Sequence, residues 1–173
     1  MGQYFKMSYR FNKESPGDFG LLGSNGKDYV INPADGSKWV PYLLYDFGWG
    51  RENGFYRFPL PSYSELIHIA MESDDQEDMY GAAAIILEKH TDCLLLFCES
   101  LFDDNVSKQK LDKAAKLFKL ELGINRSETN GKTYEEIKID SDRWIAIGRK
   151  IQQLQNSSKR KKWWRWLHKQ KAN

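Results

Sequence analysis

Two hydrophobic patterns divide the chain near Pro61. Before it, short runs of aromatic and β-branched residues are separated by glycine, asparagine, aspartate and proline, a pattern typical of strands joined by turns. After it, apolar residues recur three and four positions apart, which is the period of a helix with one buried face. The pattern predicts an α+β fold, in which an N-terminal aromatic-rich antiparallel sheet is followed by a helical C-terminal half.

Four expected strands lie in the first third of the chain, at residues 4–11, 28–31, 39–47 and 54–58. We expect residues 1–158 to form a single α+β domain, of which 1–61 are mainly strands and turns and 62–158 mainly helices. Residues 159–173 are predicted to form a basic, tryptophan-rich C-terminal tail or helix.

Clear start and stop signals mark the helical half. Ser62 and Glu65 have the spacing of a capping box for the first helix. Two amphipathic helices are expected within residues 72–104. A further helix is expected over residues 107–122, with Gly123 as its left-handed C-terminal cap.

The pattern changes once more after the loop that follows this helix. Two isoleucines alternate with polar residues, which predicts a short strand over residues 134–139. A final helix is expected to begin at Asp140 or Ser141. The polar residues 156–158 are expected to loosen the chain before the basic tail.

Charge is distributed unevenly over these elements. The net charge is +2, but residues 72–104 hold ten acids and one lysine, whereas residues 159–173 hold seven lysines and arginines and no acid. An acidic surface attracts basic partners over a long range. We interpret residues 72–104 as a partner-binding face, against the simpler interpretation of a solvated surface. The acids assigned to this face, which lie off the apolar stripe, are Asp74, Asp75, Glu77 and Asp78.

A second candidate binding surface lies around the loop between the last two expected strands. Exposed aromatic and arginine side chains are frequent anchors of protein interfaces. The residues assigned to this role are Tyr45, Phe47, Trp49 and Arg51. The competing interpretation is a sheet face whose aromatic residues pack against helices.

The tail combines cations with three tryptophans. Its candidate binding residues are Lys161, Lys162, Trp163, Trp164, Arg165 and Trp166. On a helix, Trp163, Trp166 and Leu167 share one face while most cations lie elsewhere, as in helices that bind membrane interfaces or calmodulin-like grooves. Cations among aromatic residues also suit a nucleic acid, through phosphate contacts and base stacking. A third interpretation is a helix that docks on the acidic body of the protein and buries its tryptophans.

The sequence contains no catalytic or metal-binding motif. Its three histidines are isolated, and Cys93 and Cys98 read as two small core residues of a helix. Gly26 and Lys27 are not followed by the serine or threonine of a phosphate loop. We therefore expect no enzymatic activity, no metal, no cofactor and no small-molecule ligand. With no signal peptide or membrane span in the pattern, we expect a cytoplasmic location.

Three of these features together resemble small bacterial immunity proteins of polymorphic toxin systems. They are the acidic helical rim of residues 72–104, the aromatic loop of residues 45–50 and the absence of catalytic residues. The resemblance implies a non-catalytic cytoplasmic protein that binds a cognate toxin, often a basic nuclease, and blocks it. The basic tail departs from this pattern. The alternative function is a peripheral membrane or nucleic-acid-binding adaptor that acts through the tail.

Overall fold

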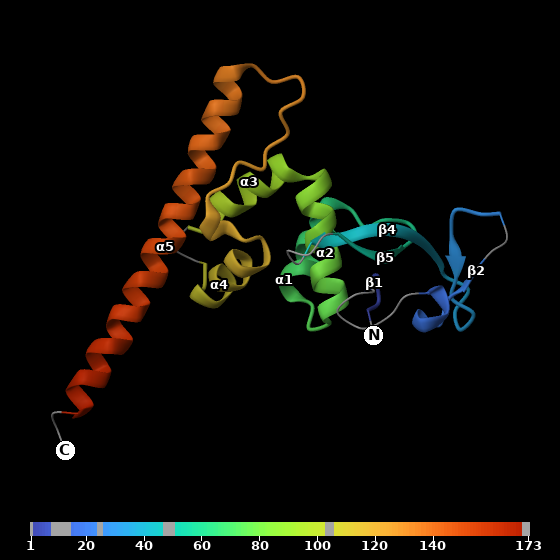
Figure 1. Cartoon of the computed structure of the whole chain (residues 1–173), viewed down its shortest axis with the longest axis horizontal. Coiled ribbons are helices and arrows are strands. Elements are labelled where there is room, and N and C mark those ends of the chain that lie inside the picture. The colour runs from blue at the N-terminus through green and yellow to red at the C-terminus, as the bar shows by residue number, and fades with distance from the viewer. Residues whose placement is uncertain (1, 8–14, 24–25, 47–50, 103–105, 171–173) are drawn as a thin grey trace. The chain divides into compact units, whose positions relative to one another are not determined.

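The computed structural model describes residues 2–7, 15–23, 26–46, 51–102 and 106–170 (Figure 1), and for residues 43–46, 51–53 and 157–170 it describes the backbone alone. The chain divides into two compact units, Met1–His90 and Thr91–Asn173. Each unit is described by itself below.

The first unit contains a five-stranded sheet in which every neighbouring pair is antiparallel. Its strands follow the order β1-β5-β4-β3-β2 and are β1 (Phe5–Met7), β2 (Leu22–Gly23), β3 (Val30–Ile31), β4 (Lys38–Asp46) and β5 (Arg51–Arg57). The expected antiparallel sheet is confirmed. The long pair β4 and β5 lies inside the sheet, and β4 is rich in the aromatic and β-branched residues that suit a pleated surface.

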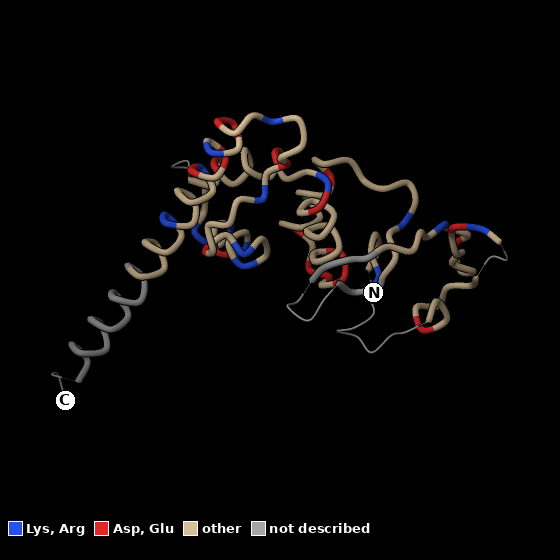
Figure 2. Tube along the Cα trace, turned by 45° about the horizontal axis from the view of Figure 1, so that its top comes forward, with Lys and Arg blue, Asp and Glu red and all other residues tan. Residues whose placement is uncertain are grey.

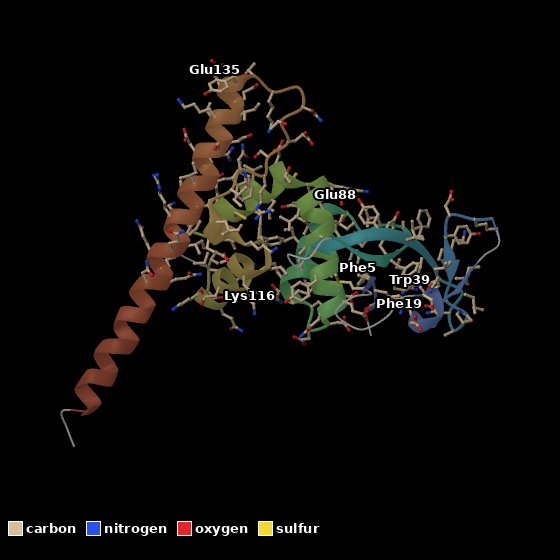
Figure 3. The ribbon with its side chains drawn as sticks, in the orientation of Figure 1. Phe5, Phe19, Trp39, Glu88, Lys116 and Glu135 are labelled. Atoms are coloured by element: carbon tan, nitrogen blue, oxygen red, sulfur yellow. The ribbon has the colours of Figure 1, made fainter. Side chains whose placement is uncertain are left out.

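The two faces of the sheet are covered by different parts of the chain. Phe5 faces the helix α2 (Gln76–Lys89), which in turn packs against α1 (Tyr63–Glu72). The opposite face is covered by the 3-10 helix η2 (Pro16–Phe19) and by Leu21, two residues after it. The second core formed there consists of Phe19, Leu21, Val30, Trp39 and Phe55 (Figure 3).

Aromatic contacts hold this second core. The rings of Phe19 and Phe55 meet edge to face at 5.3 Å between centroids. Lys6 is buried on the same face, with its ammonium 4.9 Å from the centre of the Trp39 ring. Successive residues of β1 alternate between the faces, so Phe5 and Met7 point to α2 while Lys6 points to the aromatic cluster.

The helix caps of the first unit follow from local sequence. Ser62 and Glu65 form the predicted capping box at the start of α1. Asp75 caps α2 by accepting hydrogen bonds from the N–H groups of Glu77 and Asp78. Gly81 then lets α2 approach the sheet, because a Cβ there would overlap the ring of Phe5.

The second unit is helical over its described residues. It contains α3 (Thr91–Ser100), α4 (Lys108–Leu117), the 3-10 helix η3 (Leu120–Leu122) and the 37-residue helix α5 (Tyr134–Gln170). α5 packs against η3 at a glycine contact, where a Cβ on Gly148 would lie 2.7 Å from the Cα of Gly123. The buried Trp144 closes this core, and its indole N–H donates to the hydroxyl of Ser127 at 3.0 Å.

Three local expectations for this unit are wrong. The helix expected over 107–122 ends at Leu117, because Lys119 adopts a left-handed backbone conformation with φ 50°, and η3 follows. Gly123 is left-handed as predicted, with φ 58°. Residues 134–139 are the first turns of α5, and the helix continues through residues 156–158. Thr133 and Glu136 form a capping box that the sequence contained and that identifies this start.

Candidate functional site

The first half of the acidic stretch is largely built into the fold. Glu77 and Asp78, in the first turn of α2, are each only 4% exposed. Asp78 accepts hydrogen bonds from the N–H groups of Gln3, Tyr4 and Phe5 at 2.7–2.8 Å. Glu77 accepts from the N–H groups of Gly2 and Met7 at 3.2 and 3.1 Å. The two carboxylates therefore hold the segment that contains β1, and we call them the carboxylate clamp.

The clamp corrects the expected position of these acids. Glu77 and Asp78 were expected on an exposed face, but they are buried because the backbone donors of an edge strand need acceptors there. Asp75 is half-buried at its cap, and Asp74 is exposed as expected. Burial raises the pKa of Asp78, although its three backbone hydrogen bonds oppose that shift.

A charge network uses two further acids of the stretch. Arg143 of α5 donates to both carboxylate oxygens of Glu99 of α3, at 2.7 and 2.6 Å. Lys132 bridges Asp92 and Asp140 at 2.9 and 2.8 Å, and Arg143 also meets Asp140 at 3.3 Å. Figure 2 shows acidic and basic residues close together around the start of α5. The Lys132 hydrogen bond holds the pKa of Asp140 below its usual range. The two cations of this network offset most of the charge of its three acids within the unit.

The aromatic anchors expected near residues 45–51 are only partly described. Phe47 and Trp49 lie outside the described residues. Tyr45 belongs to β4 and Arg51 to β5, and β4 and β5 stay paired up to Asp46 and Arg51. The structure places these two residues on adjacent strands, and it describes only their backbone.

The aromatic residues closer to the middle of β4 and β5 do pack within the unit. The rings of Tyr42 and Tyr56 meet edge to face at 5.8 Å between centroids. The ammonium of Lys89, at the end of α2, lies 4.9 Å from the centre of the Tyr42 ring. These contacts agree with the interpretation in which the aromatic residues of the sheet pack against a helix.

The cysteines and histidines do not form a site in the described part of the chain. Cys98 is buried, which raises the pKa of its thiol to about 12, whereas Cys93 is exposed and is not the core residue expected. His68 is exposed, and the His90 ring lies 5.4 Å from that of Tyr63. Among the described residues no group of three or more histidine, cysteine, aspartate or glutamate side chains is arranged to hold a metal ion.

The second half of α5 is the candidate binding element. The last buried residue of the helix with a described side chain is Ile151, and residues 152–156 are all exposed. The backbone remains helical to Gln170. At 1.5 Å per residue, the helix extends about 28 Å beyond Ile151. Figure 1 shows this part of α5 continuing past α3 and α4 of its own unit.

The charge along α5 changes sign from one end to the other. Its first nine residues contain four acids, at positions 135, 136, 140 and 142. From residue 143 to its end, the helix contains nine lysines and arginines and no acid. This order matches the helix dipole, which favours acids at the N-terminus and cations at the C-terminus. The sequence alone identified the basic segment but placed it after a break in the chain.

We name residues 152–170 of α5 the basic extension.

None of the described helices is both long enough and apolar enough to cross a membrane. Compared with known proteins, the chain matches no family model, no curated protein and no solved structure.

Proposed function

We propose that this protein is a non-catalytic binding protein, and that the basic extension of α5 binds an anionic ligand. The observation that carries the proposal is the course of α5, which continues as one helix well past Ile151, the last buried residue among those whose side chains the structure describes. A helix of this length is not required to cover the small core of its unit. The residues beyond the core therefore have a different role.

The charge of the basic extension defines the class of ligand. Residues 152–170 contain six lysines and arginines and no acid. A cluster of cations on one helix favours phosphate-bearing surfaces, because each phosphate contact also releases bound counterions. The acids near the start of α5 do not neutralise this charge, since at 1.5 Å per residue they lie roughly 25 Å or more away along the helix, beyond the Debye length of about 8 Å.

The experiment compares the full chain with a chain that ends at Asn156. Both are tested for binding to vesicles that contain an anionic lipid and to a short single-stranded DNA. We expect the shortened chain to lose binding and to keep its thermal midpoint, because Trp144, Ile147 and Ile151 remain in the core. Equal binding by both chains, or no binding by the full chain, contradicts the proposal.

A second candidate function is the inhibition of a basic partner, such as a nuclease toxin, through acidic residues of the first unit. Glu72 and Asp74 support it, because both are exposed where α1 leads into α2. Reversing both to lysine should slow association with a basic partner and should leave the dissociation rate nearly unchanged, because charges at the rim of an interface act mainly on encounter. A pull-down that recovers the same basic protein with both forms contradicts this second function.

A further inference from the structure

We propose that the basic extension lies in the interface of an anionic membrane, with its tryptophans in the lipid. This inference rests on the proposed function, and it names the ligand of the same segment. It follows from the continuous helical backbone to Gln170 together with the order of residues along it.

A helical backbone separates the tryptophans from most of the cations. At 100° per residue, Trp163, Trp164, Trp166 and Leu167 occupy positions within an arc of about 160°. The cations that occupy an arc of about 100° on the other side are Lys161, Lys162, Arg165 and Lys169. Lys159 and Arg160 lie within the same arc around the helix as the tryptophans, but one turn before Trp163. The aromatic face therefore begins after them.

The aromatic face does not continue the buried stripe of α5. Measured from the direction of Ile151, the aromatic positions are centred about 140° around the helix, whereas Lys169 lies at about the same angle as Ile151. The stripe that is apolar in the first half of the helix is therefore cationic in the second half. A straight helix cannot bury both stripes against the same neighbours, so the aromatic face suits a ligand other than the core of its own unit.

A membrane interface fits this arrangement better than a single-stranded nucleic acid. In a single-stranded nucleic acid the bases and the phosphates belong to the same strand. A site that stacks on the bases and contacts the phosphates therefore has its aromatic residues and cations on one surface. An interfacial helix keeps them apart, with aromatic residues at the depth of the headgroups and cations reaching the anionic phosphates from the other side. Tryptophan is also enriched at membrane interfaces.

Two variants of the full chain test the inference. The first replaces Trp163, Trp164 and Trp166 with alanine, a change that favours the helix because alanine is the best helix former. The second replaces Lys161, Lys162, Arg165 and Lys169 with glutamine. A matched control replaces four exposed cations elsewhere, namely Lys110, Lys116, Lys138 and Arg149, with glutamine.

The measurement is sedimentation with vesicles of phosphatidylcholine alone or mixed with phosphatidylserine, together with tryptophan fluorescence. We expect binding to the mixed vesicles alone, with emission shifted to shorter wavelength. The charge variant should bind at least a hundredfold more weakly, because each cation near an anionic surface changes partitioning by roughly fivefold. The tryptophan variant should lose both the binding and the spectral shift, and the control should retain both.

The outcomes separate this inference from the proposed function. Binding to single-stranded DNA without binding to vesicles overturns the membrane inference and leaves the proposed function in place. Binding to neither ligand overturns both. Vesicle binding that the tryptophan variant retains, or a dimer in solution that the same substitutions dissociate, shows that the aromatic face does not enter the lipid and overturns the inference.

Discussion

Replacing Asp78 with alanine should strongly destabilise the first unit although it removes only a small side chain. Its Oδ1 accepts from the N–H groups of Tyr4 and Phe5, and its Oδ2 accepts from that of Gln3. Phe5 is buried, whereas Gln3 is exposed and Tyr4 is intermediate. Water can therefore replace the carboxylate at the exposed end of this segment but not at Phe5.

The expected loss follows from these three contacts. A hydrogen bond to a charged group contributes about 1.5–3 kcal/mol, and a buried donor without an acceptor costs about 1–3 kcal/mol. The desolvation that raises the pKa of Asp78 offsets part of the sum. We expect Asp78→Ala to lower the free energy of unfolding by about 3–5 kcal/mol, a large part of the 5–15 kcal/mol typical of a native protein.

Asp78→Asn should be milder, with a loss of about 1–2 kcal/mol. Its amide oxygen can still accept from Tyr4 and Phe5, but its NH₂ group then faces the N–H donor of Gln3. Urea denaturation measures the loss, and hydrogen exchange at the Phe5 amide reports the clamp directly. Asp74→Ala, at an exposed position of the same turn, is the control. If Asp78→Ala unfolds at the same urea concentration as this control, with Phe5 still protected, the clamp does not hold the strand.

Three further predictions concern packing and charge. Gly81→Ala should destabilise the first unit by about 1–3 kcal/mol through overlap with Phe5; Gly17→Ala has room for its Cβ and is the control in a thermal melt. Arg143→Gln should cost about 0.5–1 kcal/mol in urea, since the pair with Glu99 is partly exposed and solvent screens it; a loss several times larger would mean that the pair is not screened. The Arg143 hydrogen bond lowers the pKa of Glu99 below its ordinary value of 4.5, so this stabilisation is present above pH 4.5 and is lost as the pH falls through the folded pKa. The difference between wild type and Arg143→Gln should therefore shrink as the pH falls below 4.5, and a constant difference would contradict this assignment.

Much of the secondary structure follows from the sequence alone. The capping box of Ser62 and Glu65, the apolar period of the helices and the left-handed Gly123 were all predicted correctly. Each depends on residues no more than about four positions apart, so local geometry determines it. The start of α5 was missed although its signal is equally local, because the alternation of two isoleucines resembles a strand and the prediction did not use the Thr133 and Glu136 capping box.

The roles of the acids depended on tertiary structure. A sequence shows that Glu77 and Asp78 lie in the first turn of a helix, where acids suit the helix dipole, and most such acids face water. Their burial depends on donors 70 or more positions earlier in the chain. The sequence pattern cannot reveal this contact, because every residue except proline carries the same backbone N–H donor and nothing marks the donors that pair with these two acids.

The basic extension shows the complementary division. Its composition and its two-sided pattern are properties of the sequence, and they led to the prediction that residues 161–166 bind a ligand. Only the structure shows that these residues continue the core helix of the second unit, with the tryptophan positions centred away from its buried stripe. The local sequence determines which face of a helix is aromatic, whereas the packing of the distant Gly123 against Gly148 determines which face of α5 is already occupied.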